Sequence, residues 1–250
     1  MSSYEFLKLG LGALLGGFVN GLAGFGTELF SLGFFLQVMP PLQAVSTTAV
    51  LAIATGRQGL WNIKAFILPN KDIIARFLLP ALPGIPIGTA LAAHISPAPL
   101  KVLLAALLFT YGIFSFKRPA KTEARNPLPA ADYLVGFAGG ILGGLASLSG
   151  VLPTMWCSLK PWEKHKIRAS LQAFNFAILT LSVLLFALQG AYSANLALKV
   201  SGCLLAAMSG AILGIRIFNA VSIAAYKNVL VTICLFVSGL PMSQSLAGMI

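Results

Sequence analysis

The sequence predicts an all-α integral membrane protein built from two inverted repeats, each a broken or re-entrant helical hairpin followed by three transmembrane helices. Composition, the placement of charge and an internal sequence match predict this fold class. Hydrophobic residues make up 58% of the 250-residue chain and charged residues only 9%, whereas soluble domains carry about 25% charged residues. The mean hydropathy is +0.89, so the chain lacks the polar residues that a soluble exterior requires.

Eight apolar runs divide the chain, and a membrane-spanning helix needs about 20 apolar residues. The runs are Tyr4–Met39, Leu42–Trp61, Ile74–Ala93, Leu100–Phe116, Tyr133–Leu159, Ala169–Leu188, Leu196–Ile217 and Ile223–Leu240. Six of them fit one crossing each. The first and the fifth are too long for one crossing, and the fifth is also too short for two.

Three clusters of basic residues lie between the runs, at Arg57–Arg76, Lys117–Arg125 and Lys160–Arg168. The positive-inside rule places all three in the cytoplasm. Tyr133–Leu159 is then flanked from the same side, so it must enter the membrane and return as a re-entrant hairpin. Short basic clusters between apolar runs also explain the formal net charge of +11 without a nucleic-acid partner.

Each hairpin contains a break rich in small residues. The predicted turn of the first run is Gly24-Phe25-Gly26-Thr27, where two tilted full crossings remain an alternative to a re-entrant hairpin. The fifth run turns at Ser147-Leu148-Ser149-Gly150, with Pro153 just inside the second leg, where a missing N–H costs little. Non-helical backbone at membrane depth must line a cavity or be buried in protein. The two breaks are therefore the predicted substrate site.

The two halves of the chain also match in sequence. Nearly the same separation relates Gly17-x-x-x-Gly21 to Gly140-x-x-x-Gly144 and Gly84-x-x-x-Gly88 to Gly210-x-x-x-Gly214. Because each half has a hairpin and an odd number of crossings, the halves should point in opposite directions. We predict two repeats, residues 1–125 and 126–250, in one compact membrane domain. The alternative is a chance likeness between glycine-rich helices.

The helix after each break should begin with unpaired N–H groups and the positive end of its dipole, which together bind anions. Glycine lets an oxyanion approach the backbone, and hydroxyl groups add donors. The predicted substrate contacts are Gly24, Gly26, Thr27, Ser147, Ser149 and Gly150. The alternative is that these residues only allow close helix packing.

Glu28 is the only acidic residue well inside an apolar run. An intramembrane carboxylate is a functional candidate by default, so we predict that Glu28 couples transport to protons or sodium ions. The alternative is a carboxylate that stabilises the N-terminus of its own helix, with Arg57 as its partner. A charged Glu28 would repel an anion, so the two breaks are not expected to be equivalent.

Four polar residues complete the predicted site. Gln172 and Asn175 share one helical face and can point into a cavity together, and interhelical hydrogen bonding is the alternative. Arg57 and Gln58 lie near the cytoplasmic end of a helix, where gating competes with simple snorkelling of the arginine. The interior offers no cluster of nucleophiles, acids or metal ligands, so we expect no enzyme, metal or cofactor.

Four stretches carry a family resemblance: AGFGTELFSLGFF at 23–35, ATGRQ at 54–58, GGLASLSGVLPTMWCSLKPW at 143–162 and RASLQAFN at 168–175. With these stretches the chain resembles the sulfite exporter TauE/SafE family of bacterial permeases over nearly its whole length. The resemblance implies a multi-pass protein of the bacterial inner membrane that moves sulfite, organosulfonates or sulfoacetate. The sequence departs from the commoner Gly-Gly-Gly pattern of that family at Thr27-Glu28, so an anion role transfers more safely to Ser147, Ser149 and Gly150.

Together these features predict a secondary transporter of a small oxyanion that works by alternating access of two repeats. An anion channel and a membrane-embedded enzyme or maturation factor are the alternatives. The expected partners are a small anion and the lipid bilayer, with a homodimer as a further possibility.

Overall fold

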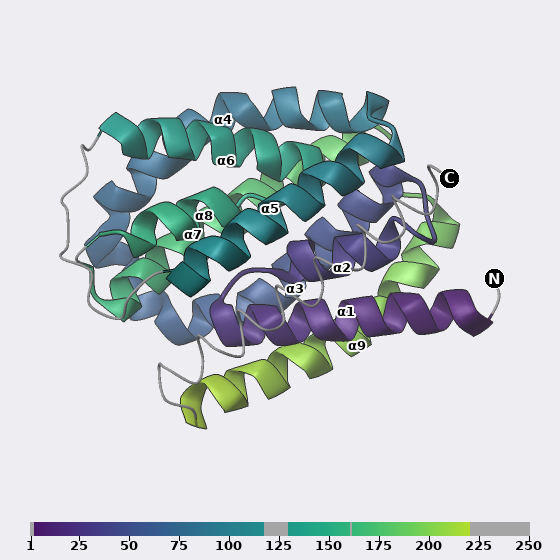
Figure 1. Ribbon diagram of the computed structural model, residues 1–250, viewed down its shortest axis with the longest axis horizontal. Helices are drawn as coiled ribbons and strands as arrows, with labels where there is room; N and C mark the ends of the chain where they lie inside the picture. Colours follow the sequence, from purple (N-terminus) through teal and green to yellow (C-terminus); the bar gives the residue numbers. More distant parts are fainter. Residues whose placement is uncertain (1–2, 118–129, 161, 221–250) are drawn as a thin grey trace.

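The computed structural model describes residues 3–117, 130–160 and 162–220, and every regular element in them is helical (Figure 1). The elements are α1 (Ser3–Ala23), α2 (Thr27–Phe35), α3 (Pro41–Ile67), the short 3-10 helix η1 (Leu68–Asn70), α4 (Lys71–His94), α5 (Pro97–Lys117), α6 (Ala130–Ala146), α7 (Val151–Ser158), α8 (Lys164–Leu188) and α9 (Ala194–Ala220). The all-helical prediction is confirmed for this part of the chain.

Four stretches of the described residues are long and apolar enough to cross a membrane. They are Ile63–His94, Pro97–Phe114, Lys166–Leu188 and Leu196–Ile217, and they coincide with four of the predicted crossings. The crossing predicted at Leu42–Trp61 lies in α3, which is 27 residues long but is not among the four. The crossing predicted at Ile223–Leu240 lies outside the described residues.

Buried hydroxyl groups lower the hydropathy of α3. Ser46, Thr47, Thr48 and Thr55 are all at most 3% exposed. Thr55 donates to the carbonyl of Leu51 at 2.8 Å, and such bonds to the preceding turn satisfy a hydroxyl within its own helix. The polar side of α3 therefore faces protein, and the helix packs against α8 in the interior.

Both predicted breaks are present in the structure. The first lies between α1 and α2 and the second between α6 and α7. The helices that follow have 9 and 8 residues, far fewer than the roughly 20 of a crossing. The second leg of the first hairpin is therefore too short to cross a membrane as one helix, as a re-entrant hairpin would require.

The same backbone conformation ends the first leg of each hairpin. Gly24 and Ser147 have φ angles of 83° and 60°, the left-handed conformation that often follows the last residue of a helix. Ser147 is the only non-glycine residue with a positive φ in the described part of the chain. Its hydroxyl donates to the Val45 carbonyl at 3.0 Å, and this bond helps to hold an otherwise unfavourable conformation.

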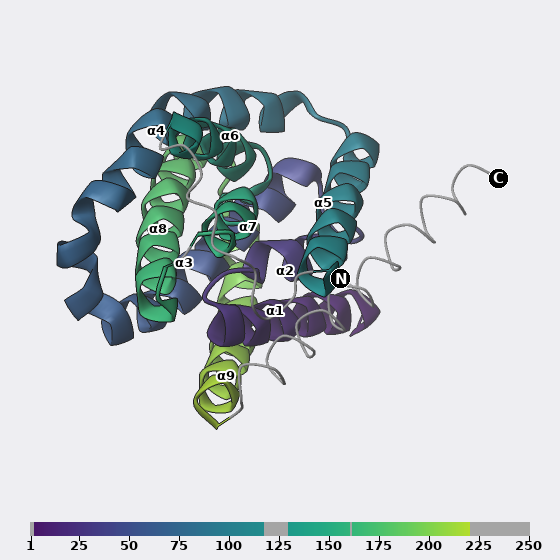
Figure 2. The same ribbon diagram turned by 60° about the vertical axis from the view of Figure 1, so that its left-hand side comes forward.

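Two close helix crossings frame the molecule. Figures 1 and 2 show α1 running beside α9 on one side and α4 beside α6 on the other, with α3 and α8 between them. At each crossing a Cβ atom on a glycine would collide with a carbonyl of the facing helix. The pairs are Gly17 with Ala207, Gly21 with Ala211, Gly140 with Ala81 and Gly144 with Ile85. Glycine is required here because the backbones touch.

Replacing Gly144 with leucine should lower the free energy of unfolding by about 1–3 kcal/mol, the usual cost of overpacking. The new side chain would meet the Ile85 carbonyl and the Thr89 backbone nitrogen on α4. Gly202→Leu is the matched control, because Gly202 is exposed on α9 with nothing within 4 Å of its Cβ position. Thermal unfolding in detergent compares the two variants, and equal stability would contradict the close crossing.

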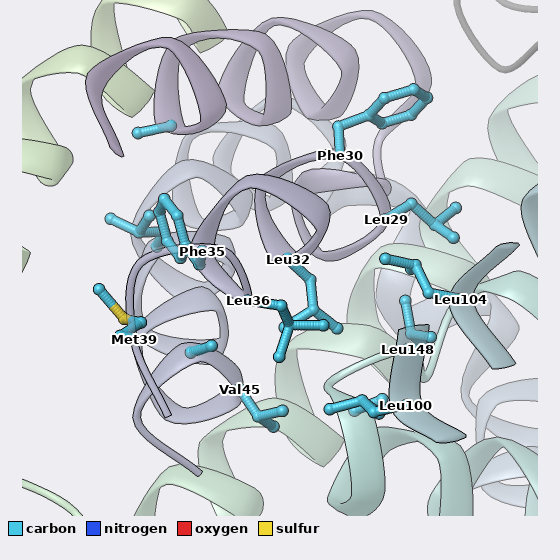
Figure 3. Close-up of a cluster of buried hydrophobic side chains, with 14 of the residues drawn as sticks. Leu29, Phe30, Leu32, Phe35, Leu36, Met39, Val45, Leu100, Leu104 and Leu148 are labelled. Carbon is cyan, nitrogen blue, oxygen red and sulfur yellow. The ribbon is translucent and has the colours of Figure 1, made fainter. Parts of the chain in front are cut away.

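The short helix α2 lies inside the protein. Seven of its residues are buried, from Thr27 to Leu32 together with Phe35. Apolar side chains of other elements surround it, among them Val45 of α3, Leu100 and Leu104 of α5 and Leu148 of the second break (Figure 3). Neighbouring helices thus shield the polar ends of α2 from lipid, as a broken helix at membrane depth requires.

Candidate functional site

The two breaks meet at one side chain of α8. Asn175 donates from Nδ2 to Oε1 of Glu28 at 3.0 Å, and its Oδ1 accepts the hydroxyl hydrogen of Ser149. Only 6% of Asn175 is exposed. A Cβ atom on Gly150 would lie 3.3 Å from Cβ of Phe25 and 3.5 Å from Oδ1 of Asn175. Residues far apart in the sequence thus form one buried cluster.

At the start of α7, backbone N–H groups lack hydrogen-bond acceptors among the described residues. Within the described residues no hydrogen bond engages the N–H of Gly150, Val151 or Leu152, and Pro153 has no N–H to offer. Gly150 and Val151 are buried. Buried N–H groups are almost always paired in folded proteins, and those at a helix N-terminus favour a negatively charged ligand. This end of α7 can therefore bind an anion.

Glu28 occupies the equivalent end of α2. The N–H of Gly26 donates to Oε2 of Glu28 at 3.1 Å, so the carboxylate stabilises the start of its own helix, as one of the two interpretations predicted. Its side-chain partner is Asn175 and not Arg57, which is exposed on α3. The suggested pairing with Arg57 is wrong because the guanidinium lies at the surface. The first break already holds an acidic side chain, and the second does not.

The hydroxyl of Thr27 belongs to a separate buried network. It accepts from Nδ2 of Asn20 at 2.9 Å and lies 3.1 Å from Oγ1 of Thr55, while Asn20 also donates to Thr55 at 2.7 Å. These bonds join α1, α2 and α3. The predicted anion donor Thr27 is thus engaged with protein in this conformation.

The two serines of the second break differ in their surroundings. Ser147 donates to the Val45 carbonyl and so has no proton left for a ligand. Ser149 donates to Asn175, directly before the unpaired N–H groups of α7. Of the two predicted serine donors, Ser149 is the one next to the candidate anion site.

Gln172 lies at the first break. It is 4% exposed, and its amide makes no hydrogen bond within the described residues. Its Nε2 is 3.4 Å from the position that a Cβ atom on Gly24 would take. An unsatisfied buried amide is costly, which makes Gln172 a candidate for contact with a ligand. The prediction that Gln172 and Asn175 share an interior face agrees with this placement.

Arg168 lies at the first break, although from the sequence it was assigned only to a cytoplasmic cluster and to the family stretch 168–175 and not to the candidate site residues. Its Nη2 lies 3.4 Å from the carbonyl of Gly21, and its Nε is 3.4 Å from the Cβ position of Gly24. Arg168, Gln172 and Asn175 follow one another at four and three residues, a spacing that places them on one helical face. This spacing is the sequence feature from which Arg168 could have been added to the candidate site residues. A guanidinium group can pair with an oxyanion through two parallel N–H bonds.

A comparison of the sequence with known protein families shows to which family this chain belongs. The profile of the sulfite exporter TauE/SafE family matches residues 9–241. The chain belongs to this family. No curated protein and no solved structure matches it. The chain is thus a multi-pass membrane protein of a family of sulfite- and sulfonate-type transporters, which are not enzymes.

Two residues were predicted to gate this TauE/SafE protein, and both lie on α3 beside residues that contact the first break. Arg57 is exposed and Gln58 is partly buried on α3. Within the described residues neither is hydrogen-bonded to a residue of the two breaks. Their role in gating stays a prediction.

Lys160 follows the second leg of the second hairpin and contacts the start of its first leg. It was predicted as a cytoplasmic loop charge, but it is only 8% exposed and forms an ion pair with Asp132 near the start of α6. Nε1 of Trp156 donates to the same Asp132 oxygen at 2.7 Å, and the Trp162 ring lies 4.4 Å from Nζ of Lys160. An acidic partner and aromatic rings enclose this lysine, so its side chain is not solvated as charges between membrane helices usually are.

Proposed function

We propose that this TauE/SafE protein is a secondary transporter that binds a small oxyanion, such as sulfite or an organosulfonate, between its two breaks, in the bacterial inner membrane. The observation that carries the proposal is the buried start of α7. The N–H groups of Gly150, Val151 and Leu152 have no acceptor in the described chain. An oxyanion supplies several acceptor oxygens and the negative charge that a helix N-terminus favours.

The first break and α8 add complementary groups. Arg168 and Gln172 both lie beside Gly24, and Asn175 connects this region to Ser149. A positive charge within the span of a membrane protein is usually functional. We therefore propose that Arg168 attracts the anion and that Gln172 and the N–H groups of α7 bind it.

The close crossings support the proposal that residues 1–125 and 126–250 are inverted repeats. The helix α1 crosses α9, and its counterpart α6 crosses α4, the counterpart of α9. The glycines in these crossings are those that match in sequence between the halves. Because each tight pair contains one helix from each half, alternating access would move α1 with α9 and α4 with α6, rather than one intact half against the other.

Ligand-dependent unfolding tests the proposed binding. Purified protein is heated with sulfite, thiosulfate or methanesulfonate, and with acetate and chloride for comparison. A ligand at a hundred times its dissociation constant stabilises the folded state by about 2.7 kcal/mol. We expect stabilisation by at least one sulfur oxyanion and a smaller effect from acetate and chloride. Failure of all three sulfur oxyanions to stabilise the protein would overturn the proposal.

Glu28 is the proposed coupling group. Glu28→Gln should keep exchange of sulfite across a vesicle membrane but lose accumulation driven by a proton gradient, because the amide cannot carry a proton on and off. Glu163→Gln is the matched control, since Glu163 is exposed just before α8. Accumulation by Glu28→Gln at the wild-type level would exclude the coupling role. Wild-type flux that follows only the anion's own gradient would instead indicate a channel.

A further inference from the structure

We propose that Asn175 is a positioning residue that converts protonation of Glu28 into a free hydroxyl donor at Ser149 for the transported anion. The inference rests on the proposed function and explains how one proton could be coupled to one anion. It is carried by the direction of the hydrogen bonds that join the two breaks.

While Glu28 is ionised, Ser149 donates a hydrogen bond to Asn175, and Asn175 donates one to Glu28. A carboxylate only accepts hydrogen bonds, and Glu28 accepts from the N–H of Gly26 at Oε2 and from Nδ2 of Asn175 at Oε1. With its Nδ2 turned to Glu28, Asn175 must present Oδ1 to Ser149. The single hydroxyl proton of Ser149 is then directed at Oδ1 and cannot serve an anion beside Gly150.

Protonation of Glu28 allows this direction to reverse. A proton on Oε1 makes that oxygen a donor, and the Asn175 amide can turn to present Oδ1 to Glu28 and Nδ2 to Oγ of Ser149. Ser149 then accepts, and its own proton becomes available to an anion at the start of α7. One proton is added at Glu28, none leaves the chain, and each group of the relay remains hydrogen-bonded.

The arrangement of the breaks favours this role for Asn175. Ser149 and Glu28 lie on different hairpins, and Asn175 is the residue that bonds to both. All three are buried, with exposed fractions of 0%, 3% and 6%, so water does not compete easily for their bonds. In such surroundings hydrogen bonds polarise one another and an unpaired group is costly. A change at Glu28 should therefore be passed on to Ser149.

Other charged groups lie on the elements around Glu28. Among the side chains that the structure describes there, the titratable and charged ones are Tyr4, Glu5 and Lys8 on α1, Arg57 and Lys64 on α3, Lys101 and Tyr111 on α5, and Lys166 and Arg168 on α8. Tyr111 packs edge-on against Phe25 with ring centroids 5.6 Å apart, and Arg168 contacts the end of α1. An arginine stays charged and a tyrosine neutral in assays near neutral pH, so neither Arg168 nor Tyr111 accounts for a change of affinity with pH, and Glu28→Gln tests whether Glu28 does.

Binding of methanesulfonate as a function of pH tests the relay, because the charge of this anion does not change over the range used. Wild-type affinity should rise as pH falls, by roughly tenfold to a hundredfold for one hydrogen bond to a charged ligand. Asn175→Leu should bind at every pH as tightly as the wild type does at low pH, since Ser149 is released. Asn70→Leu, at the last residue of η1 and remote from the breaks in the chain, should behave as wild type.

Two further variants keep the test decisive if Asn175→Leu folds poorly. Glu28→Gln places a permanent donor opposite Asn175 and should fix the affinity at the tight level. Ser149→Ala removes the hydroxyl and should fix it at the weak level, while Ser149→Thr restores the pH dependence. Wild-type pH dependence in Asn175→Leu or in Ser149→Ala would show that the charge of Glu28 acts directly on the anion, which overturns the relay alone. Absence of binding by the wild type to every sulfur oxyanion overturns the proposed function as well.

Discussion

Replacing Gly150 with leucine should abolish uptake of radiolabelled sulfite into proteoliposomes while leaving the protein folded. The Cβ position at Gly150 faces Phe25 and Asn175 at 3.3 and 3.5 Å, so a longer side chain would press against residues of the first break and of α8. It would also cover the first N–H groups of α7. The backbone angles of Gly150, φ −82° and ψ −17°, are ordinary right-handed values, so leucine adds no backbone strain.

Gly202→Leu is again the matched control, since it adds the same side chain on the exposed face of α9. It should transport at the wild-type rate. Gly150→Ala should fall between the two, because its single methyl group contacts Phe25 but extends no further. Uptake by Gly150→Leu at the rate of the control would contradict an anion site at this break.

Replacing Lys160 with methionine should destabilise the protein by about 3–5 kcal/mol, the usual result of leaving one partner of a buried ion pair uncompensated. The remaining partner, Asp132, is 1% exposed and would keep only the hydrogen bond from Trp156. Chemical unfolding of the purified protein measures the loss.

The double variant Asp132→Asn with Lys160→Met separates the charge from the packing. It removes both charges but leaves an acceptor for Trp156, so most of the lost stability should return. A loss below about 1 kcal/mol in the single variant would be typical of an exposed pair. That result would contradict burial of Lys160 at the open end of the second hairpin.

The breaks could be predicted from the sequence because their chemistry is local. Glycine, serine and threonine in an otherwise apolar run weaken the helix, and the length of Tyr133–Leu159 required a return to the same side. The structure ends α6 at Ala146 and begins α7 at Val151, on either side of the predicted turn. In the same way, the glycine pattern that matched between the halves marks the positions where helix backbones touch.

The partners of individual side chains could not be predicted in this way. Lys160 and Arg168 were placed in one cytoplasmic cluster because the positive-inside rule counts charges and does not identify neighbours. Lys160 pairs instead with Asp132, and Arg168 lies at the first break. The hydroxyl of Ser147 similarly bonds to a carbonyl about a hundred residues away. Such pairings depend on how the two halves pack together, and local sequence does not contain that information.

The central claim is that the two breaks form one anion site at the start of α7. Crystals grown in lipid and soaked with selenite, the selenium analogue of sulfite, test it most directly, because anomalous scattering marks the position of the anion. We expect one strong peak within hydrogen-bonding distance of the backbone nitrogens of Gly150 and Val151, beside Asn175. A peak only at other positions, or none at a concentration that stabilises the protein against unfolding, would contradict the claim.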